Sequence, residues 1–230
     1  MWQTLSNAWR EFGLGIGSMY LVDQALHRVS RDARLRFYEL MVQPIVDEPL
    51  VDARFTRGFT YREIVATDPE VALMPARDDI KAERFAQGAT CLGAFRDDKF
   101  IGYMWFVKES YLEDEVRCVF HVHPTDTAVF DFDFYVFPEH RMGLGFIALW
   151  DGANRYLFEQ GIRSTFSRIT RFNTASRRAH DHLGWRRVGR AVFLKLWRFE
   201  LMVADVRPYL SISIARSHRV RLDLREPASR

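Results

Sequence analysis

Cysteine is scarce in this chain, which has only Cys91 and Cys118 among its 230 residues. Each cysteine stands in an apolar, strand-like run, which favours a buried reduced thiol over a catalytic one. Reduced thiols are typical of the cytoplasm, and we expect that compartment.

Long apolar runs and a strong excess of one charge are also missing. No segment has about 18 uninterrupted apolar residues, so we expect no membrane span. Residues Met1–Phe12 do not combine a cationic start with an apolar run, so we expect no signal peptide. The net charge is only +3, from 33 basic and 30 acidic residues. This balance argues against a nucleic-acid partner but is compatible with an anionic cofactor.

Two common nucleotide loops are absent. No Gly-Lys-Ser/Thr follows a glycine turn, and no GxGxxG stands in a βαβ context with an acidic ribose ligand. What is present is the segment from Asp131 to Gln160: an alternating strand, Pro138, a turn with Gly143 and Gly145, and a helix. Alternation places Asp131, Asp133 and Tyr135 on one face and Phe132, Phe134 and Val136 on the other. Glycines in a turn before a helix N-terminus let the backbone come close to a ligand, which suits a diphosphate, as in acyl-CoA binding. The alternative is an ordinary strand–helix connection.

A second pattern follows directly. Residues Arg163–Thr170 predict a strand, and either Asn173 or Ser176 is placed to cap a helix over Arg177–Leu183. Gly184 ends that helix, and another strand begins at Trp185. Over roughly Thr90–Leu196 the order of these elements resembles the GNAT acyltransferases, the Gcn5-related N-acetyltransferase superfamily.

The resemblance implies an acyl-CoA co-substrate, most simply acetyl-CoA, and no metal. Pro138–Phe146 resembles the family's pyrophosphate loop, Arg/Gln-x-x-Gly-x-Gly/Ala, and Asn173–Trp185 resembles its Asn-x-x-Ala/Ser and Leu-Gly-Phe segment. His140 stands at the usual Arg/Gln position, unless the loop is one residue short and Arg141 takes that role. The backbone near Val136 and Phe137 is expected to polarise the thioester carbonyl. The implied cofactor-binding residues are Val136, Phe137, Arg141, Met142, Gly143, Leu144, Gly145, Phe146, Asn173 and Ser176.

For catalysis, the amine acceptor must be neutral and the thiolate must leave. Asp131 and Asp133 are the candidate bases, because two carboxylates on one strand face raise one pKa; the alternative is that they pair with arginines or face water. His180 stands where the family often has a tyrosine that protonates the thiolate; the alternative is a helix surface residue. The acidic run Glu113-Asp114-Glu115 either borders the acceptor site or forms a solvated turn.

His121 and His123 share one face of a predicted strand, and Asp126 or Asp131 could complete a metal site with them. Two histidines without a third ligand at a diagnostic spacing do not support a metal centre, so we expect none. The alternative role of His123 is to line the acceptor pocket.

The N-terminus carries an aromatic stripe of Trp2, Leu5, Trp9 and Phe12 at helical spacing. Gly13, Gly15 and Gly17 then predict a break before a second helix over Met19–Val29. The stripe packs on the protein or a partner, or contacts a membrane interface. We divide the chain into an N-terminal helical extension (1–30), a GNAT-like domain (31–214) and a basic, solvated C-terminal tail (215–230).

The expected fold is α/β or α+β, with a mainly antiparallel central sheet, a locally parallel strand pair beside the cofactor, and helices on both faces. Further strands are predicted at Arg34–Ile45 and Glu115–Val122, a helix at Arg77–Gln87, and a hairpin of Thr90–Phe95 with Phe100–Val107. Phe59–Thr67 is expected to be either another strand or an element of the acceptor side. The expected function is N-acylation of a small molecule or sugar precursor. The alternatives are a non-catalytic acyl-CoA-binding protein and a partner-binding scaffold. The oligomeric state stays open.

Overall fold

The structure is a computed structural model that describes residues 2–30, 32–141, 144–181, 183–215 and 217–227. Side chains are described from Gly15 onward, except those of residues 175, 178 and 179. Contacts divide the chain into two units. The first unit contains Met1–Met41, Glu113–Phe120 and Arg168–Arg230, and the second contains Val42–Leu112 and His121–Ser167.

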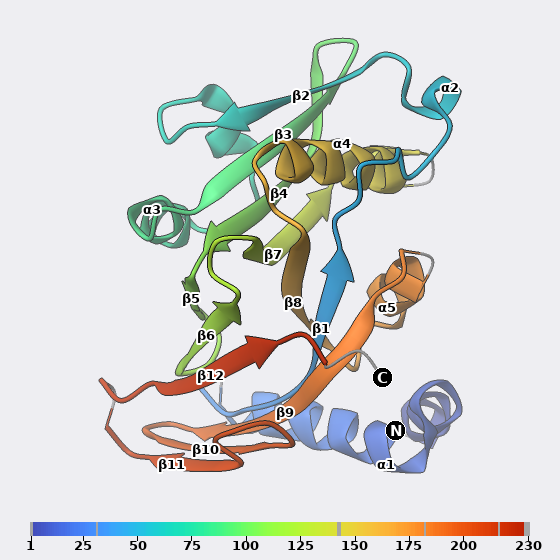
Figure 1. Cartoon of the computed structure of the whole chain (residues 1–230). Coiled ribbons are helices and arrows are strands. Elements are labelled where there is room, and N and C mark those ends of the chain that lie inside the picture. The colour runs from blue at the N-terminus through green and yellow to red at the C-terminus, as the bar shows by residue number, and fades with distance from the viewer. Residues whose placement is uncertain (1, 31, 142–143, 182, 216, 228–230) are drawn as a thin grey trace. The chain divides into compact units, whose positions relative to one another are not determined.

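The second unit is built on a sheet with the strand order β2-β3-β4-β7-β8 (Figure 1). Antiparallel pairing joins β2 to β3, β3 to β4 and β4 to β7, whereas β7 and β8 are parallel. The parallel register runs from Ala128 opposite Ser164 to Asp131 opposite Ser167. This confirms the predicted mainly antiparallel sheet with one parallel pair. The elements are α2 (Ala53–Thr56), β2 (Phe59–Ile64), a 3-10 turn η1 (Pro69–Leu73), α3 (Asp78–Ala86), β3 (Thr90–Arg96), β4 (Lys99–Lys108), β5 (Ser110–Leu112), β7 (Ala128–Val136), the 3-10 turn η2 (Pro138–His140), α4 (Gly145–Glu159) and the start of β8 (Ser164–Thr170).

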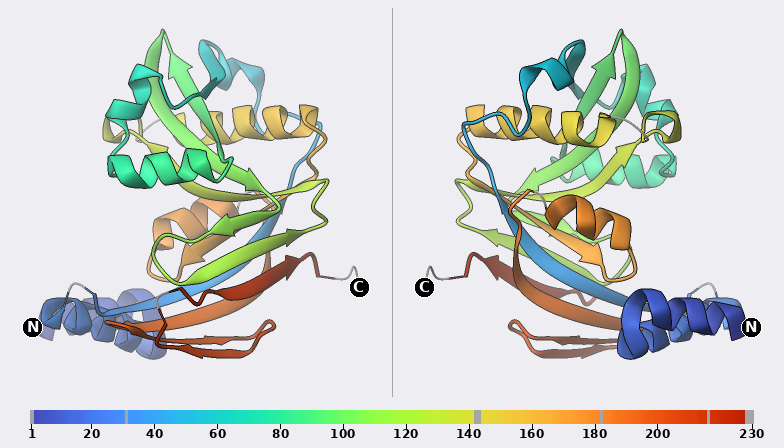
Figure 2. Two further views of the ribbon diagram at one scale, coloured as in Figure 1. Left: turned by 90° about the vertical axis from the view of Figure 1, so that its left-hand side faces the viewer. Right: turned by 90° about the vertical axis from the view of Figure 1, so that its right-hand side faces the viewer.

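Helices cover both faces of this sheet. On one face Phe85 of α3 packs edge-on against Trp105 of β4, with ring centroids 4.7 Å apart. On the other face Trp150 of α4 stacks on Phe134 of β7 at 5.4 Å. Figure 2 shows α4 running across the strands of this unit. The predicted hairpin is confirmed, because Asp97 and Asp98 at its turn have φ angles of 49° and 61°, as a type I′ turn requires.

The first unit contains a second group of strands in the order β11-β10-β9-β1. Its strand β12 pairs with β6, and Val220, Leu222 and Leu224 of β12 are buried. The expectation of a solvated tail is therefore wrong over these residues. Alternating apolar positions place one face of this arginine-rich segment in the core. The elements are α1 (Trp2–Val29), β1 (Arg34–Pro44), part of β6 (Cys118–His123), α5 (Thr174–Asp181), β9 (Arg186–Leu196), β10 (Phe199–Ala204), β11 (Leu210–Ser213) and β12 (Val220–Arg225).

Helix α1 continues without interruption through Gly13, Gly15 and Gly17. The predicted break is wrong, because glycine weakens a helix by about 1 kcal/mol but, unlike proline, removes no hydrogen bond. The second half of α1 is held by Asp23, whose carboxylate accepts the backbone N–H of Leu35 at 2.9 Å. The aromatic stripe from Trp2 to Phe12 lies outside the described side chains. Among the described helices, none has the length and apolar character that a bilayer crossing requires.

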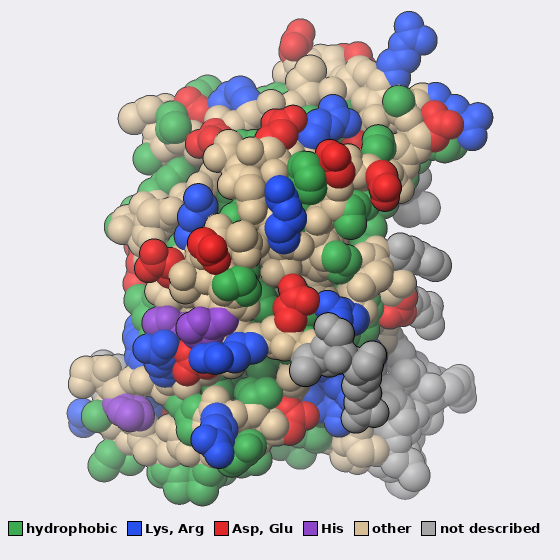
Figure 3. Space-filling view, in the orientation of Figure 1, with side chains coloured by type: hydrophobic (Ala, Val, Ile, Leu, Met, Phe, Trp, Pro, Cys, Tyr) green, Lys and Arg blue, Asp and Glu red, His purple; other side chains and the backbone are tan. Residues whose placement is uncertain are grey.

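Both cysteines are buried and free, as predicted. Burial raises the pKa of the Cys91 and Cys118 thiols, so neither is a thiolate at neutral pH. On the face seen in Figure 3, acidic and basic side chains are interspersed, in keeping with the small net charge.

Close packing of α4 on β2 depends on Gly152. A Cβ atom at this position would lie 2.3 Å from Cε1 of Tyr61, whose hydroxyl donates a hydrogen bond to the carbonyl of Ala148 at 2.7 Å. We expect Gly152→Ala to lower the free energy of unfolding by about 1–3 kcal/mol through overpacking. Urea unfolding measures this change.

The matched control is the same substitution in a Tyr61→Ala background. Without the ring, the alanine should stabilise α4 by up to about 1 kcal/mol through its higher helix propensity. Equal destabilisation in both backgrounds would contradict the role assigned to Tyr61.

Candidate active site

The predicted strand, turn and helix are present as β7, η2 and α4. The turn is fixed by backbone bonds from His140 N–H to the carbonyl of Phe137 (2.9 Å) and from Arg141 N–H to that of Pro138 (3.3 Å). Leu144 is the N-cap of α4 and contributes no side-chain hydrogen bond to the helix. The positive end of α4 therefore receives no acceptor from its cap side chain, which favours an external anion. Met142 and Gly143, both predicted to bind the cofactor, lie outside the described residues.

Gly145 allows the loop to fold back closely on itself. A Cβ atom there would lie 2.7 Å from the carbonyl oxygen of His140 and 3.1 Å from Cγ1 of Val136. Real Cβ atoms do not approach a backbone oxygen so closely, so any larger residue must displace the loop. The glycine is required by packing at the start of α4.

Arg141 turns back onto β7. Its Nε donates to the carbonyl of Val136 at 2.7 Å, and its guanidinium lies over the ring of Tyr135, 5.0 Å from the centroid. The side chain therefore braces the end of the strand. His140, the other residue considered for the family's Arg/Gln position, lines a hollow of about 210 Å³ at the start of α4.

That hollow also brings in Arg96, which the sequence did not indicate. Arg96 ends β3, lies over the ring of Phe59 at 5.3 Å and lines the hollow together with Glu139, Leu144 and Gly145. It pairs only loosely with Asp97, at 4.0 Å. Long-range strand pairing alone places this cation beside the start of α4, so no local pattern could have identified it.

The N–H groups near Val136 and Phe137 were expected to polarise the thioester carbonyl, and one of them is already used. The N–H of Phe137 donates to the carbonyl of Ile101 at 3.0 Å, so it is used within the sheet and is not available to a ligand. Successive residues of a strand direct their N–H and C=O groups to alternate sides. The N–H of Val136 consequently points away from β4, to the same side as its carbonyl, which accepts Arg141.

A bulge in β7 separates the two predicted bases. Phe132 is opposite Trp105 and Tyr135 is opposite Tyr103, so the register shifts by one residue between these pairs. Asp133, at the shift, has a left-handed backbone with φ of 51°. Phe132 and Tyr135 therefore share a face, and the regular alternation predicted from the sequence is wrong beyond Phe132.

The carboxylates accordingly lie on opposite faces of the sheet. Asp133 forms an ion pair with Arg84, whose guanidinium lies over Trp105 and Phe132 at 5.8 and 5.4 Å. Asp131 is only 5% exposed and accepts a hydrogen bond from the Thr165 hydroxyl at 2.7 Å. The argument that two neighbouring carboxylates raise one another's pKa therefore fails. The Asp133 side chain is 25% exposed and is the more accessible of the two.

The predicted residues of α5 belong to the first unit. Asn173 caps this helix, because its Oδ1 accepts the N–H of Ser176 at 3.0 Å. This decides between the two predicted caps in favour of Asn173. His180 lies on α5 and is buried, which corrects the view of it as a surface residue. Burial lowers the pKa of His180 to about 4, although Asp181 opposes the shift. Its imidazole is uncharged at neutral pH, so it has no imidazolium proton to give to a thiolate.

The acidic run is a solvated turn only in part, because Asp114 and Glu115 are exposed but Glu113 is buried. Glu113 is 1% exposed and receives two hydrogen bonds from Arg168, at 2.8 and 2.6 Å. Glu115 accepts the Tyr38 hydroxyl at 2.6 Å and Nε of Arg36 at 3.2 Å. These arginines lie far away in the sequence, so the acidic run alone could not reveal its partners.

Among the described residues, His121 and His123 do not join a group of three or more metal-ligating side chains.

The buried His180 makes stability depend on pH. The imidazole has a pKa near 6.5 in the unfolded chain and about 4 in the folded one, so between these values the unfolded state binds more protons. The free energy of unfolding should fall by up to roughly 3 kcal/mol as the pH drops from about 6.5 to about 4. Urea unfolding at several pH values should show a smaller fall for His180→Gln than for the parent. The control His218→Gln, at an exposed histidine, should keep the parent's dependence. An equal dependence in parent and His180→Gln would contradict the burial effect.

The chain was compared with known proteins. A search of curated proteins finds no match. Similar solved structures include a conserved protein of unknown function from Staphylococcus epidermidis (14% identity, TM-score 0.47, 74% of this chain and 64% of that one). Others are a tandem GNAT protein from the clavulanic acid biosynthesis pathway (16%, 0.48, 75% and 57%) and a GCN5-related N-acetyltransferase from Sphaerobacter thermophilus (15%, 0.46, 77% and 55%). The chain thus spans less than two thirds of the length of each of these three structures.

The model of the acetyltransferase (GNAT) family matches residues 59–185, which is more than half of the chain. That range includes the hairpin, the bulged strand β7, the loop and the helices α4 and α5. On this match, the protein belongs to the acetyltransferase (GNAT) family.

Proposed function

We propose that this chain transfers an acyl group, most simply acetyl, directly from acyl-CoA to an amine of a small molecule or sugar-type precursor. The observation that carries the proposal is the start of α4, which has no side-chain cap. It follows β7 through the short turn η2, and Arg96 lines the hollow beside it. Family membership supports the same reaction. Acyl-CoA, when bound, would supply the acyl group as a thioester, and CoA would leave as the thiolate.

The diphosphate is proposed to lie at the N-terminus of α4. The N–H groups of Leu144, Gly145 and Phe146 are proposed to hold it, and Gly145 keeps the approach open. Arg96 supplies a guanidinium at the neighbouring hollow, where bidentate contact with a phosphate is favourable. Arg141 is proposed to stabilise the end of β7, because its Nε already donates a hydrogen bond to the carbonyl of Val136.

The thioester carbonyl is proposed to accept the N–H of Val136. This N–H points to the open side of β7, whereas that of Phe137 is bonded to Ile101. A donor fixed by the strand before the reaction stabilises the oxyanion without reorganisation. The predicted roles of Asn173 and Ser176 in cofactor binding stay predictions.

Asp133 is proposed to take the proton of the attacking amine, directly or through one water. Its carboxylate is partly exposed, and Arg84 and the bulge hold it in one orientation. Asp131 is less suited to this role, because it is buried and bonded to Thr165. The role predicted for His180 toward the thiolate stays a prediction, and a neutral imidazole could act there only as a hydrogen-bond donor.

The cofactor site is tested by Gly145→Val. The added side chain collides with the His140 carbonyl and displaces the loop, so calorimetric affinity for CoA should fall at least tenfold, about 1.4 kcal/mol. Gly15→Val is the matched control, because a Cβ at Gly15 has no neighbouring atom within 4 Å. Wild-type CoA affinity in a folded Gly145→Val variant would rule out this loop as the diphosphate site.

The base is tested by Asp133→Asn. Turnover, followed as release of free CoA with a panel of amines, should fall by roughly a hundredfold to ten-thousandfold, because general-base catalysis contributes on the order of 10²–10⁴. CoA affinity should stay near wild type. Asp131→Asn serves as the comparison and should lower turnover less. Unchanged turnover in Asp133→Asn would assign the base to another group.

A second candidate is a protein that binds acyl-CoA without transferring the acyl group. The neutral state of His180 and the ion pair of Asp133 favour it, because both remove the features expected of an acid and a base. Saturable CoA binding without CoA release for any amine would support this candidate over the enzyme. Association with a membrane through the N-terminal helix remains a separate proposal, tested by fractionation after deletion of Met1–Gly17.

A further inference from the structure

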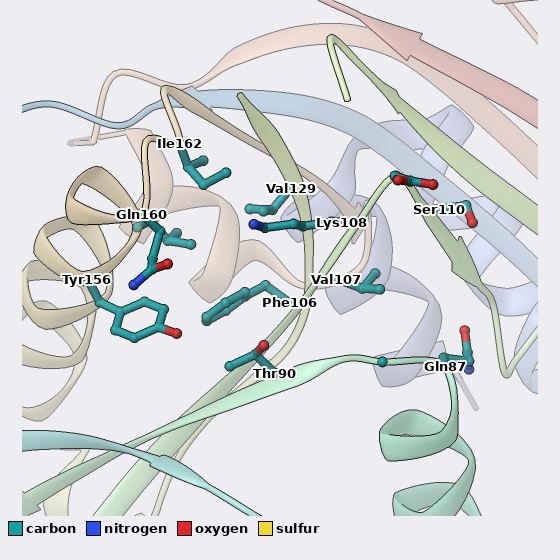
Figure 4. Close-up of a pocket in the computed structure, with 13 residues that line it drawn as sticks. Gln87, Thr90, Phe106, Val107, Lys108, Ser110, Val129, Tyr156, Gln160 and Ile162 are labelled. Atoms are coloured by element: carbon teal, nitrogen blue, oxygen red, sulfur yellow. The ribbon is translucent and has the colours of Figure 1, made fainter. Parts of the chain in front are cut away.

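A pocket of about 450 Å³ lies beside the last turns of α4 in the second unit (Figure 4). Tyr156 and Gln160 line it from the helix side, and Phe106 and Lys108 from β4. Among the described residues, its lining shares no member with the hollow at Gly145. Tyr156 comes eleven residues after Gly145, which is roughly 16 Å along the helix axis. The pocket is therefore separate from the proposed diphosphate site, and its volume lies in the range of small-molecule sites.

One wall of the pocket is aromatic. The rings of Phe106 and Tyr156 approach at a tilt, with centroids 5.6 Å apart, and the fully buried Val129 and Ile162 lie behind this wall. Figure 4 shows the Phe106 ring beside the Tyr156 ring. Such a wall suits the carbon skeleton of a small ligand.

The positive charge comes from Lys108. Figure 4 shows its side chain reaching across the pocket toward the side of Gln160. In the part of the chain that the structure describes, Lys108 has no ion pair or side-chain hydrogen bond. Glu109 also lines the pocket, but its backbone is left-handed (φ of 64°) and its carbonyl accepts the Val122 N–H at 3.0 Å. The backbone is thus fixed directly after Lys108, and the Lys108 ammonium is available to pair with an anion.

Tyr156 limits the ligand further. Its hydroxyl donates to Oε1 of Glu63 at 2.5 Å, and burial together with Glu63 raises the pKa of this phenol. With its proton engaged, the phenol oxygen can only accept a hydrogen bond from the pocket side. Thr90 and the Gln160 amide can both donate and accept. A ligand that fits must therefore combine an anionic group with a hydroxyl or amine donor.

We propose that this pocket is a second ligand site, distinct from the acyl-CoA site, for a small organic anion that carries hydroxyl or amine groups. The carboxylate or phosphate pairs with Lys108, the carbon skeleton lies on Phe106, and a donor group bonds the oxygen of Tyr156.

Calorimetry with three related probes tests the site: glycerol 3-phosphate, glycerate and glycerol. One-to-one saturable binding of a charged probe, with a Kd of about 1 mM or tighter and no response to glycerol, supports the proposal. Binding of only one of the two anions assigns the site to phosphate or to carboxylate. Absence of binding by both anions at about 10 mM overturns it.

The variants locate the binding. Lys108→Met should lower the affinity for the anion at least tenfold. Lys99→Met, at the other end of the same strand, should leave this affinity unchanged. Tyr156→Phe should lower the affinity for the anionic probe but leave the dependence of that affinity on salt concentration unchanged. The substitution removes a hydrogen-bond acceptor and no charge. Unchanged anion affinity in Lys108→Met would overturn the proposal. Because Lys108→Met should keep wild-type CoA affinity, a loss of CoA binding would also overturn the separation of the two sites. Anion affinity thus tests the pocket, and CoA affinity tests the acyl-CoA site independently.

Discussion

The left-handed backbone at Asp133 is the constraint on which the site depends. Without the extra residue, β7 would keep strict alternation, and Asp131, Asp133 and Tyr135 would share a face. The bulge instead sends Asp133 to Arg84 and lets Phe134 stack on Trp150 of α4. A non-glycine residue in this conformation costs of order 1 kcal/mol or more, and the ion pair and the aromatic packing on both sides offset that cost. One residue therefore determines both the face on which Asp133 lies and the packing of α4 on β7.

Local patterns predicted the hairpin, the strand–turn–helix unit and the parallel pair, because each depends on periodicity, turn residues or chain connection. The face of each carboxylate could not be read in this way. A period-two pattern has no signal for a bulge when the inserted residue is an aspartate between two phenylalanines. Arg84 and Arg96 were missed for a related reason. Arg84 meets Asp133 only through packing of α3 on the sheet, and Arg96 reaches the start of α4 only through pairing of distant strands.

Charge patterns were misleading where burial reversed their meaning. The run Glu113-Asp114-Glu115 suggests a solvated turn, yet Arg168 and Arg36 reach Glu113 and Glu115 from far along the chain. His180 suggests a titrating acid, but burial removes its charge at neutral pH. The α1 glycines suggested a break, but no proline or competing cap enforces one. In each case the tertiary environment outweighed an intrinsic preference.

Val136 links the two halves of the proposed chemistry. Its Cγ1 limits the space beside Gly145, its carbonyl accepts Arg141, and its N–H points to the open side of the strand. A shift of the loop would therefore move the donor proposed for the thioester. An anion held at the start of α4 would in turn stabilise the position of Val136, since Arg141 belongs to the same loop. Binding of the diphosphate and polarisation of the thioester carbonyl would then be coupled through the backbone of Val136. A change at Gly145 should therefore affect turnover as well as CoA affinity.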